Sequence, residues 1–222
     1  MRTSAQVSTF QRAVVVGAAL GGVLWGFTGV VALLDPGPDP GPTGSSSFYL
    51  IEGGHALAET GMFVALIGLW RSQTQRIGRL GDVLFGLAVT ATVLLAVLTY
   101  VVVGGTALGV GPNVAAAQTM PASIVALASV LFLFTLVGLL AGYIGSGVTT
   151  IRAGVWPPFI GRPLIAHPFL LVANLVIYPV GIVIGVLWLA LAWVAGKTPL
   201  AGSAPFSVLD QAGEGQGSHQ GR

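Results

Sequence analysis

Residues 48–70 read FYLIEGGHALAETGMFVALIGLW, and this stretch decides the fold. It is long and apolar enough for a helix that crosses a bilayer, which needs about 20 residues rising 1.5 Å each. It nevertheless carries Glu52, His55 and Glu59. Helical periodicity puts these three side chains on one face, within an arc of about 60°. Because ionisable groups at bilayer depth are costly, we expect this face to look into a helix bundle.

The composition of the whole chain supports a membrane protein. Of 222 residues, 54% are hydrophobic and 7% are charged, with a mean hydropathy of +0.89. Soluble domains carry about 25% charged residues, so a single water-soluble domain is excluded. Cysteine is absent, which excludes disulfides and cysteine-ligated metal sites within the chain. The few basic residues form no patch or motif that binds nucleic acid, so no nucleic-acid partner is expected.

The apolar runs predict an all-α, polytopic transmembrane helical bundle of five spans. A Pro-rich stretch at 35–47 and a Gly-rich stretch at 104–120 separate some of these runs, and basic segments separate others. Tyr178-Pro179 is expected to bend the last span. The bundle is expected to occupy 1–195, with a disordered tail at 196–222. The predicted spans are 13–34, 48–70, 83–103, 121–143 and 169–194.

Basic residues predict the orientation. Five spans place the two ends of the chain on opposite faces, and a cytoplasmic N-terminus gives the stronger positive-inside bias. The inner segments then hold Arg2, Arg12, Arg71, Arg76, Arg79, Arg152 and Arg162. The outer side holds only Lys197 and Arg222, of which Lys197 directly follows the last span. We therefore expect the N-terminus inside and the C-terminus outside.

Residues 154–161, GVWPPFIG, lie in a basic turn before the last predicted span. Over residues 151–195 the chain resembles small multi-pass bacterial membrane proteins of unassigned function, which carry a basic turn with Pro and Trp at this point. The resemblance implies a bundle in a bacterial-type cell membrane and offers no catalytic residue. This chain has Pro158 where the usual pattern has a basic residue. Arg152, Trp156 and Arg162 are expected at the inner interface, as anchors or as contacts for a lipid headgroup.

The Glu52, His55 and Glu59 stripe has three interpretations. Counted from Phe48, these residues lie at depths of about 6, 10 and 16 Å, and Tyr178 falls near the deepest of them. The stripe can be a polar clasp between helices, a proton or small-cation path, or half of a metal site, because Glu52-x-x-His55 has the spacing found in di-iron bundles.

We expect an integral membrane protein or subunit that is not an enzyme and holds no cofactor. The alternatives are a proton or small-cation transporter and, third, a metal-dependent membrane enzyme. Expected partners are the lipid bilayer and, in addition, a second copy of the chain or a larger membrane complex.

Overall fold

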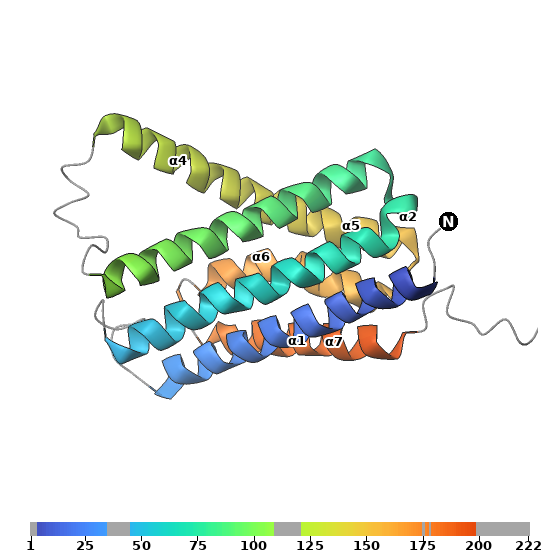
Figure 1. The fold of residues 1–222 in the computed structure, drawn as a ribbon, viewed down its shortest axis with the longest axis horizontal. Coiled ribbons are helices and arrows are strands. Elements are labelled where there is room, and N and C mark those ends of the chain that lie inside the picture. Colours follow the sequence, from blue (N-terminus) through green and yellow to red (C-terminus); the bar gives the residue numbers. More distant parts are fainter. Residues whose placement is uncertain (1–3, 35–44, 109–120, 175, 178, 199–222) are drawn as a thin grey trace, which may run out of the picture.

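The computed structural model describes residues 4–34, 45–108, 121–174, 176–177 and 179–198, and all regular structure among them is helical. The helices run back and forth along one long axis (Figure 1). They are α1 (Ser4–Leu34), α2 (Ser46–Ala107), α4 (Ala122–Val137), the π-helical turn η1 (Gly138–Tyr143), α5 (Ile144–Ala153), α6 (Pro158–Asn174) and α7 (Val180–Lys197).

Four helical stretches among the described residues are long and apolar enough to cross a membrane. They are Ser8–Leu34, Ser46–Ala107, Ala126–Ala153 and Val180–Lys197. A mean hydropathy of 2.0 or more in each supports the interpretation of the chain as a membrane protein.

Helix α2 is a hairpin of two antiparallel arms (Figure 1). The chain reverses at Gly78, whose φ of 64° is open to glycine at little steric cost. Trp70 and Asp82 join the arms beside the turn, where the indole Nε1–H donates to Asp82 Oδ1 at 2.8 Å. The expected helices at 48–70 and 83–103 are both present, but the basic segment between them is helical on either side of Gly78 rather than a loop.

The helix expected to end at Tyr143 continues to Ala153. It passes through the π-helical turn η1 into α5 and stops at Gly154, which caps it in the left-handed conformation with φ 63°. The segment 144–153 lies beyond the predicted span, and its small and polar residues are typical of a connector. Those residues allow close packing, and Gly147 lies backbone to backbone against Gly161 of α6.

The single helix expected at 169–194 is two helices, which corrects the prediction. Helix α6 begins at Pro158, a first-turn position where a missing N–H costs nothing, and ends at Asn174. Helix α7 begins at Val180, directly after Pro179. The two helices form a hairpin and are bonded through Trp188 and His167. The proline therefore reverses the chain here instead of bending one span.

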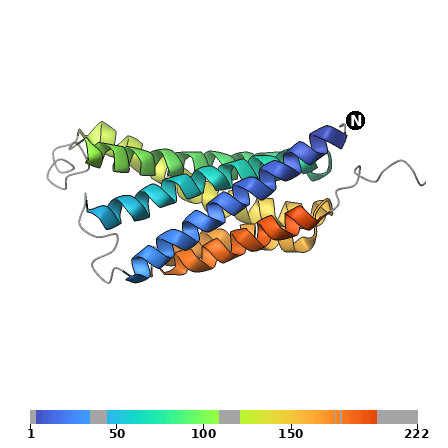
Figure 2. The same ribbon diagram turned by 60° about the horizontal axis from the view of Figure 1, so that its bottom comes forward.

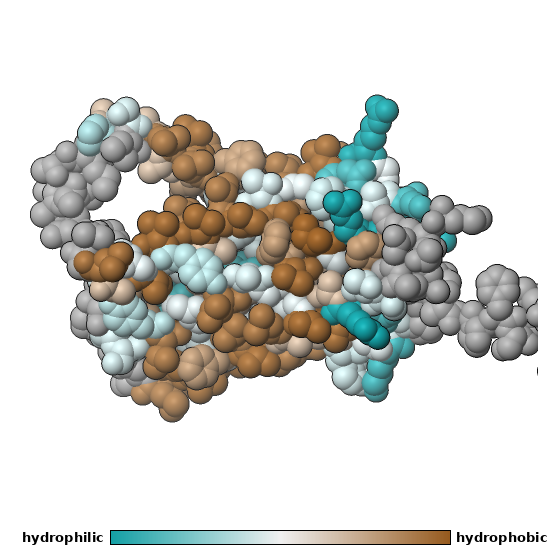
Figure 3. Space-filling model, in the orientation of Figure 1, coloured by the Kyte–Doolittle hydropathy of each residue, from teal (hydrophilic) through white to brown (hydrophobic). Residues whose placement is uncertain are grey.

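This extra helix changes the position of the C-terminal end. The Gln11 Nε2–H₂ group near the start of α1 donates to Ala195 O at 2.7 Å and to Thr198 O at 2.8 Å at the end of α7. The start of α1 and the end of α7 therefore lie at the same end of the bundle, whereas five spans would put them at opposite ends. Lys197 now lies at the same end as the arginines, where Figure 3 shows the hydrophilic side chains gathered. The expected tail lies outside the described residues from 199 onward, and residues 196–197 belong to α7.

Glycines bring α1 into contact with both of its neighbours, between which it runs in Figure 2. A Cβ on Gly17 would lie 2.5 Å from the Gly61 carbonyl oxygen of α2, and a Cβ on Gly22 would lie 2.8 Å from the Gly185 carbonyl oxygen of α7. The small residues thus allow the backbones to touch, as is common in membrane bundles.

Candidate functional site

A pocket of about 130 Å³ opens between the helices at the end of the bundle opposite the arginines. The three residues of the predicted stripe line it from the first arm of α2, residues 46–77. Side chains of α1, of the second arm of α2 (residues 79–107) and of α6 complete the wall. The lining residues are Trp25, Glu52, His55, Glu59, Leu95, Thr99, Leu171 and Asn174. The structure therefore brings Glu52, His55 and Glu59 together on one inward wall.

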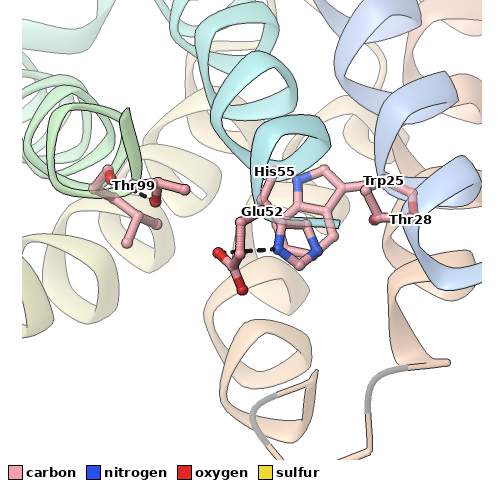
Figure 4. A network of polar contacts seen from close by, with 6 residues as sticks. Trp25, Thr28, Glu52, His55 and Thr99 are labelled. Atoms are coloured by element: carbon pink, nitrogen blue, oxygen red, sulfur yellow. Dashed lines mark hydrogen bonds and ion pairs between the residues drawn. The ribbon is translucent and has the colours of Figure 1, made fainter. Parts of the chain in front are cut away.

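Glu52 and His55 form the mouth of this pocket. The His55 Nδ1 atom lies 3.9 Å from Glu52 Oε2, and the two side chains are 13% and 20% exposed. The imidazole stacks on the Trp25 ring with a centroid separation of 4.4 Å, while Thr99 lies across from them on the second arm of α2 (Figure 4). The Trp25 Nε1–H donates in turn to the Met62 sulfur at 3.2 Å, which fixes the indole. The mouth is thus a preformed polar wall.

Glu59 lies at the inner end of the pocket and is 1% exposed. Neither of its carboxyl oxygens has a hydrogen-bond partner among the described residues, and Asn174 Oδ1 beside it also lacks one. No lysine or arginine lines the pocket. An ionised carboxylate without a counter-charge is costly at this depth, so the Glu59 carboxyl must take up a proton, a cation or water.

A second group of buried polar side chains lies outside the pocket and extends toward the arginine end. Tyr143 is fully buried and shares a 2.8 Å hydrogen bond with Thr92. The His167 ring stacks on Tyr143 at 4.8 Å, and its Nδ1 atom accepts from Trp188 Nε1–H at 3.5 Å. These residues come from four different helical segments and occupy the centre of the bundle.

Helix α5 continues this polar group. Ser146 and Thr150 follow Tyr143 on one helical face and are fully buried. The Gln73 Nε2–H₂ group of α2 donates to Thr150 Oγ1 at 2.9 Å. Ser146 Oγ, Gln73 Oε1 and His167 Nε2 have no partner among the described residues, as Glu59 has none. Buried polar groups are ordinarily hydrogen-bonded, so three unpartnered atoms in this part of the bundle are unusual.

The residues expected at the inner interface lie at the arginine end, but they differ in exposure. Arg152 and Arg162 are exposed. Trp156 is 2% exposed, and its Nε1–H donates to Ser72 Oγ at 2.9 Å. Its expected position against lipid is therefore corrected: the indole packs inside the bundle. Tyr178, expected near Glu59, lies outside the described residues.

The described part of the chain gathers no group of three or more His, Cys, Asp or Glu side chains able to hold a metal ion. Glu52 and His55 have the spacing of half a di-iron site, yet no second pair lies near them in that part. No protein family, curated protein or solved structure matches the chain. The geometry of the buried polar groups is thus the basis for a functional proposal.

The sequence predicts the polar residues of the pocket, Glu52, His55 and Glu59, but not the second group of buried polar side chains toward the arginine end. The prediction ends a span at Tyr143, and the i, i+3, i+7 spacing that puts Tyr143, Ser146 and Thr150 on one helical face extends beyond that end. That spacing was the available signal. His167 precedes the predicted span at 169–194, and the structure shows that it belongs to helix α6 and is buried.

Proposed function

We propose that this chain is a non-enzymatic, multi-pass integral membrane protein that carries protons across a bacterial-type cell membrane by way of Glu59. Six segments cross the membrane in this proposal: α1, the two arms of α2, the α4–η1–α5 helix, α6 and α7. The N-terminal end of α1 and the C-terminal end of α7 then both lie on the cytoplasmic side.

The arrangement of charges supports this orientation. Every lysine and arginine among the described residues lies at one end of the bundle, as Figure 3 illustrates on the face it displays. The positive-inside rule assigns that end to the cytoplasm. Lys197, which is anomalous with five spans, obeys the rule with six. The pocket mouth at Glu52 and His55 consequently opens on the outer side.

The single observation that carries the proposal is the unpartnered carboxyl of Glu59 at the inner end of an outward-opening pocket. The carboxyl group of Glu52 and the imidazole of His55 lie between Glu59 and the outer solution, and side chains of these two types can pass protons. An interhelical clasp would require Glu59 to bond with a neighbouring helix, and it has no hydrogen-bond partner among the described residues. The geometry thus favours an ion-binding role over a clasp.

Proton flux in liposomes tests the proposal. Purified protein is reconstituted with a pH-sensitive dye trapped inside, and an outside-acid pH gradient is imposed with valinomycin and K⁺ to clamp the potential. The unaltered protein should acidify the lumen, and Glu59→Gln should abolish this flux because the amide cannot release a proton. Tyr100→Phe, which alters a tyrosine that is 43% exposed, is the matched control and should conduct normally.

Two other results would overturn the proposal. One is vesicles that stay as tight as protein-free ones under every gradient and polarity. The other is a flux that Glu59→Gln leaves unchanged. A flux that requires Na⁺ or K⁺ at constant pH would replace the proton by a small cation as the transported species, and it would contradict the proton assignment.

A further inference from the structure

The pocket at Glu59 has a polar inner end and an apolar side. Glu59 and Asn174 are 1% and 4% exposed and line it from α2 and α6. Their oxygens Glu59 Oε1, Glu59 Oε2 and Asn174 Oδ1 have no hydrogen-bond partner among the described residues. Leu95, Leu171 and the ring of Trp25 supply the apolar side. A proton on Glu59 would neutralise the carboxylate, but it would fill none of this cavity.

The hydrogen-bond donors of two neighbouring side chains in the wall are already committed. The Trp25 Nε1–H donates to the Met62 sulfur at 3.2 Å, and the Thr99 hydroxyl donates to the Leu95 carbonyl oxygen at 3.0 Å. The three unpartnered oxygens of Glu59 and Asn174 therefore receive no hydrogen from Trp25 or Thr99. An ammonium group carries three N–H donors, so a bound ammonium ion would satisfy these oxygens.

The electrostatics of the pocket favour a cation. Two of its lining residues, Glu52 and Glu59, are acidic, and no lysine or arginine lines it. Asn174 is the last residue of α6, and the C-terminal end of a helix carries a partial negative charge. The acidic mouth, the buried carboxyl group and the helix end thus all attract positive charge.

The size of the pocket favours an organic cation over a bare ion. Its volume of about 130 Å³ is well above the ~30 Å³ that one water molecule occupies in the liquid. The part of the chain that the structure describes also gathers no group of His, Cys, Asp or Glu side chains able to hold a metal ion. A bare ion would leave Leu95 and Leu171 uncovered, whereas a cation with a short hydrocarbon part would contact both ends of the site.

We infer that the pocket binds a small primary alkylammonium ion in exchange for the proton on Glu59. The ammonium group binds the Glu59 carboxylate and Asn174 Oδ1, and the hydrocarbon part packs against Leu95, Leu171 and Trp25. This inference rests on the proposed function and names a second ligand for the same site. The proton gradient would then drive the exchange of protons for amines across the membrane.

Proton release accompanies the binding of the amine. One O–H bond of the Glu59 carboxyl group breaks, its proton passes to water at the pocket mouth, and no other covalent bond changes. The other titratable groups of the lining are Glu52 and His55. Tyr143 of η1 and His167 of α6 are buried but do not line the pocket. We therefore expect about one proton to be released for each alkylammonium ion bound.

Calorimetric titration of the purified full chain in detergent tests the inference, with propylammonium chloride as the ligand. Titrations in two buffers of different ionisation enthalpy give both the affinity and the number of protons released. Propylammonium should bind about tenfold more tightly than methylammonium, because it buries two more CH₂ groups. Uncharged 1-propanol and Na⁺ should give no heat beyond that of protein-free micelles.

Two variants locate the ammonium group. Glu59→Gln should abolish binding, because the amide carries no charge and has no proton to exchange. Asn174→Leu should weaken binding about tenfold, because a hydrogen bond to a charged group is lost. Tyr100→Phe, which alters a residue outside the pocket lining, is the control and should bind propylammonium like the unaltered protein.

The outcomes separate the two proposals. If the protein carries protons in liposomes but propylammonium does not bind, or binds without releasing a proton, the ligand class is wrong and the proposed function stands. Displacement of the proton by Na⁺ but not by propylammonium, or equal binding of 1-propanol, would also overturn the ligand class. If the protein carries no protons while propylammonium binding depends on Glu59, the proposed transport falls and the amine site stands.

Discussion

Replacing Glu59 with methionine should stabilise the protein while it abolishes proton flux. Methionine has nearly the length of glutamate and no hydrogen-bonding requirement in a site that is 1% exposed. A buried polar group without a partner costs about 1–3 kcal/mol, and Glu59→Met removes one. We therefore expect the free energy of unfolding to rise by about 1–3 kcal/mol.

The opposite sign is expected if Glu59 holds helices together. Interhelical hydrogen bonds in membranes contribute about 0.6–2 kcal/mol, so a clasp would lose that amount in Glu59→Met. Unfolding in mixed micelles of rising SDS fraction, followed by tryptophan fluorescence, measures the difference. Glu52→Met is the control; its side chain is partly exposed at the pocket mouth and should change stability by less than about 0.5 kcal/mol. A destabilised Glu59→Met variant would refute the reasoning.

Two further predictions concern packing. Gly61→Ala should destabilise the fold by about 1–3 kcal/mol, because the added Cβ would lie 2.7 Å from the backbone of α1. Gly86→Ala is the control and should not destabilise the fold, because a Cβ there would have nothing within 4 Å. Equal unfolding curves for the two variants would contradict this prediction. Trp156→Phe should lower the free energy of unfolding by about 0.5–1.5 kcal/mol, because it removes a buried hydrogen bond. Trp193→Phe, at a position 63% exposed, should lower it by less. The reverse order in the same assay would indicate that Trp156 faces lipid.

The membrane class and the inward face of the stripe were predictable because both follow from local pattern. Apolar length identifies a span, and a 3.6-residue period places Glu52, His55 and Glu59 on one face. The cost of exposing them to lipid then turns that face toward the bundle. No knowledge of the other helices is needed for either step.

The number of segments was not predictable in the same way, because it depended on what Pro179 does. A proline can kink a helix or end it, and sequence alone does not distinguish the two. Only the packing of α7 on α1, through Gly185 and Gly22, shows that the chain reverses. Because the chain reverses near Pro179, Lys197 lies at the arginine end, and the start of α1 and the end of α7 lie on one side of the bundle.

The inner polar face was missed for a related reason. Ser146 and Thr150 lie in a segment of low hydropathy that resembles a connector, and in the structure this segment is a helix in close contact with α6 at Gly161. A contact between distant segments cannot be read from local composition. The hydrogen bond between Tyr143 and Thr92 is likewise a tertiary feature that joins residues far apart in the sequence.

Thiol labelling at the pocket mouth tests the central claim most directly, because the chain contains no cysteine of its own. The claim is that water reaches the Glu59 face of α2 from the end of the bundle opposite the arginines. His55→Cys in intact vesicles should react with a membrane-impermeant thiol reagent from that side only. Leu57→Cys, which is 49% exposed but lies on the outer surface of the bundle, should stay unlabelled in lipid. Labelling at position 57 with none at position 55 would place the stripe against lipid and contradict the account.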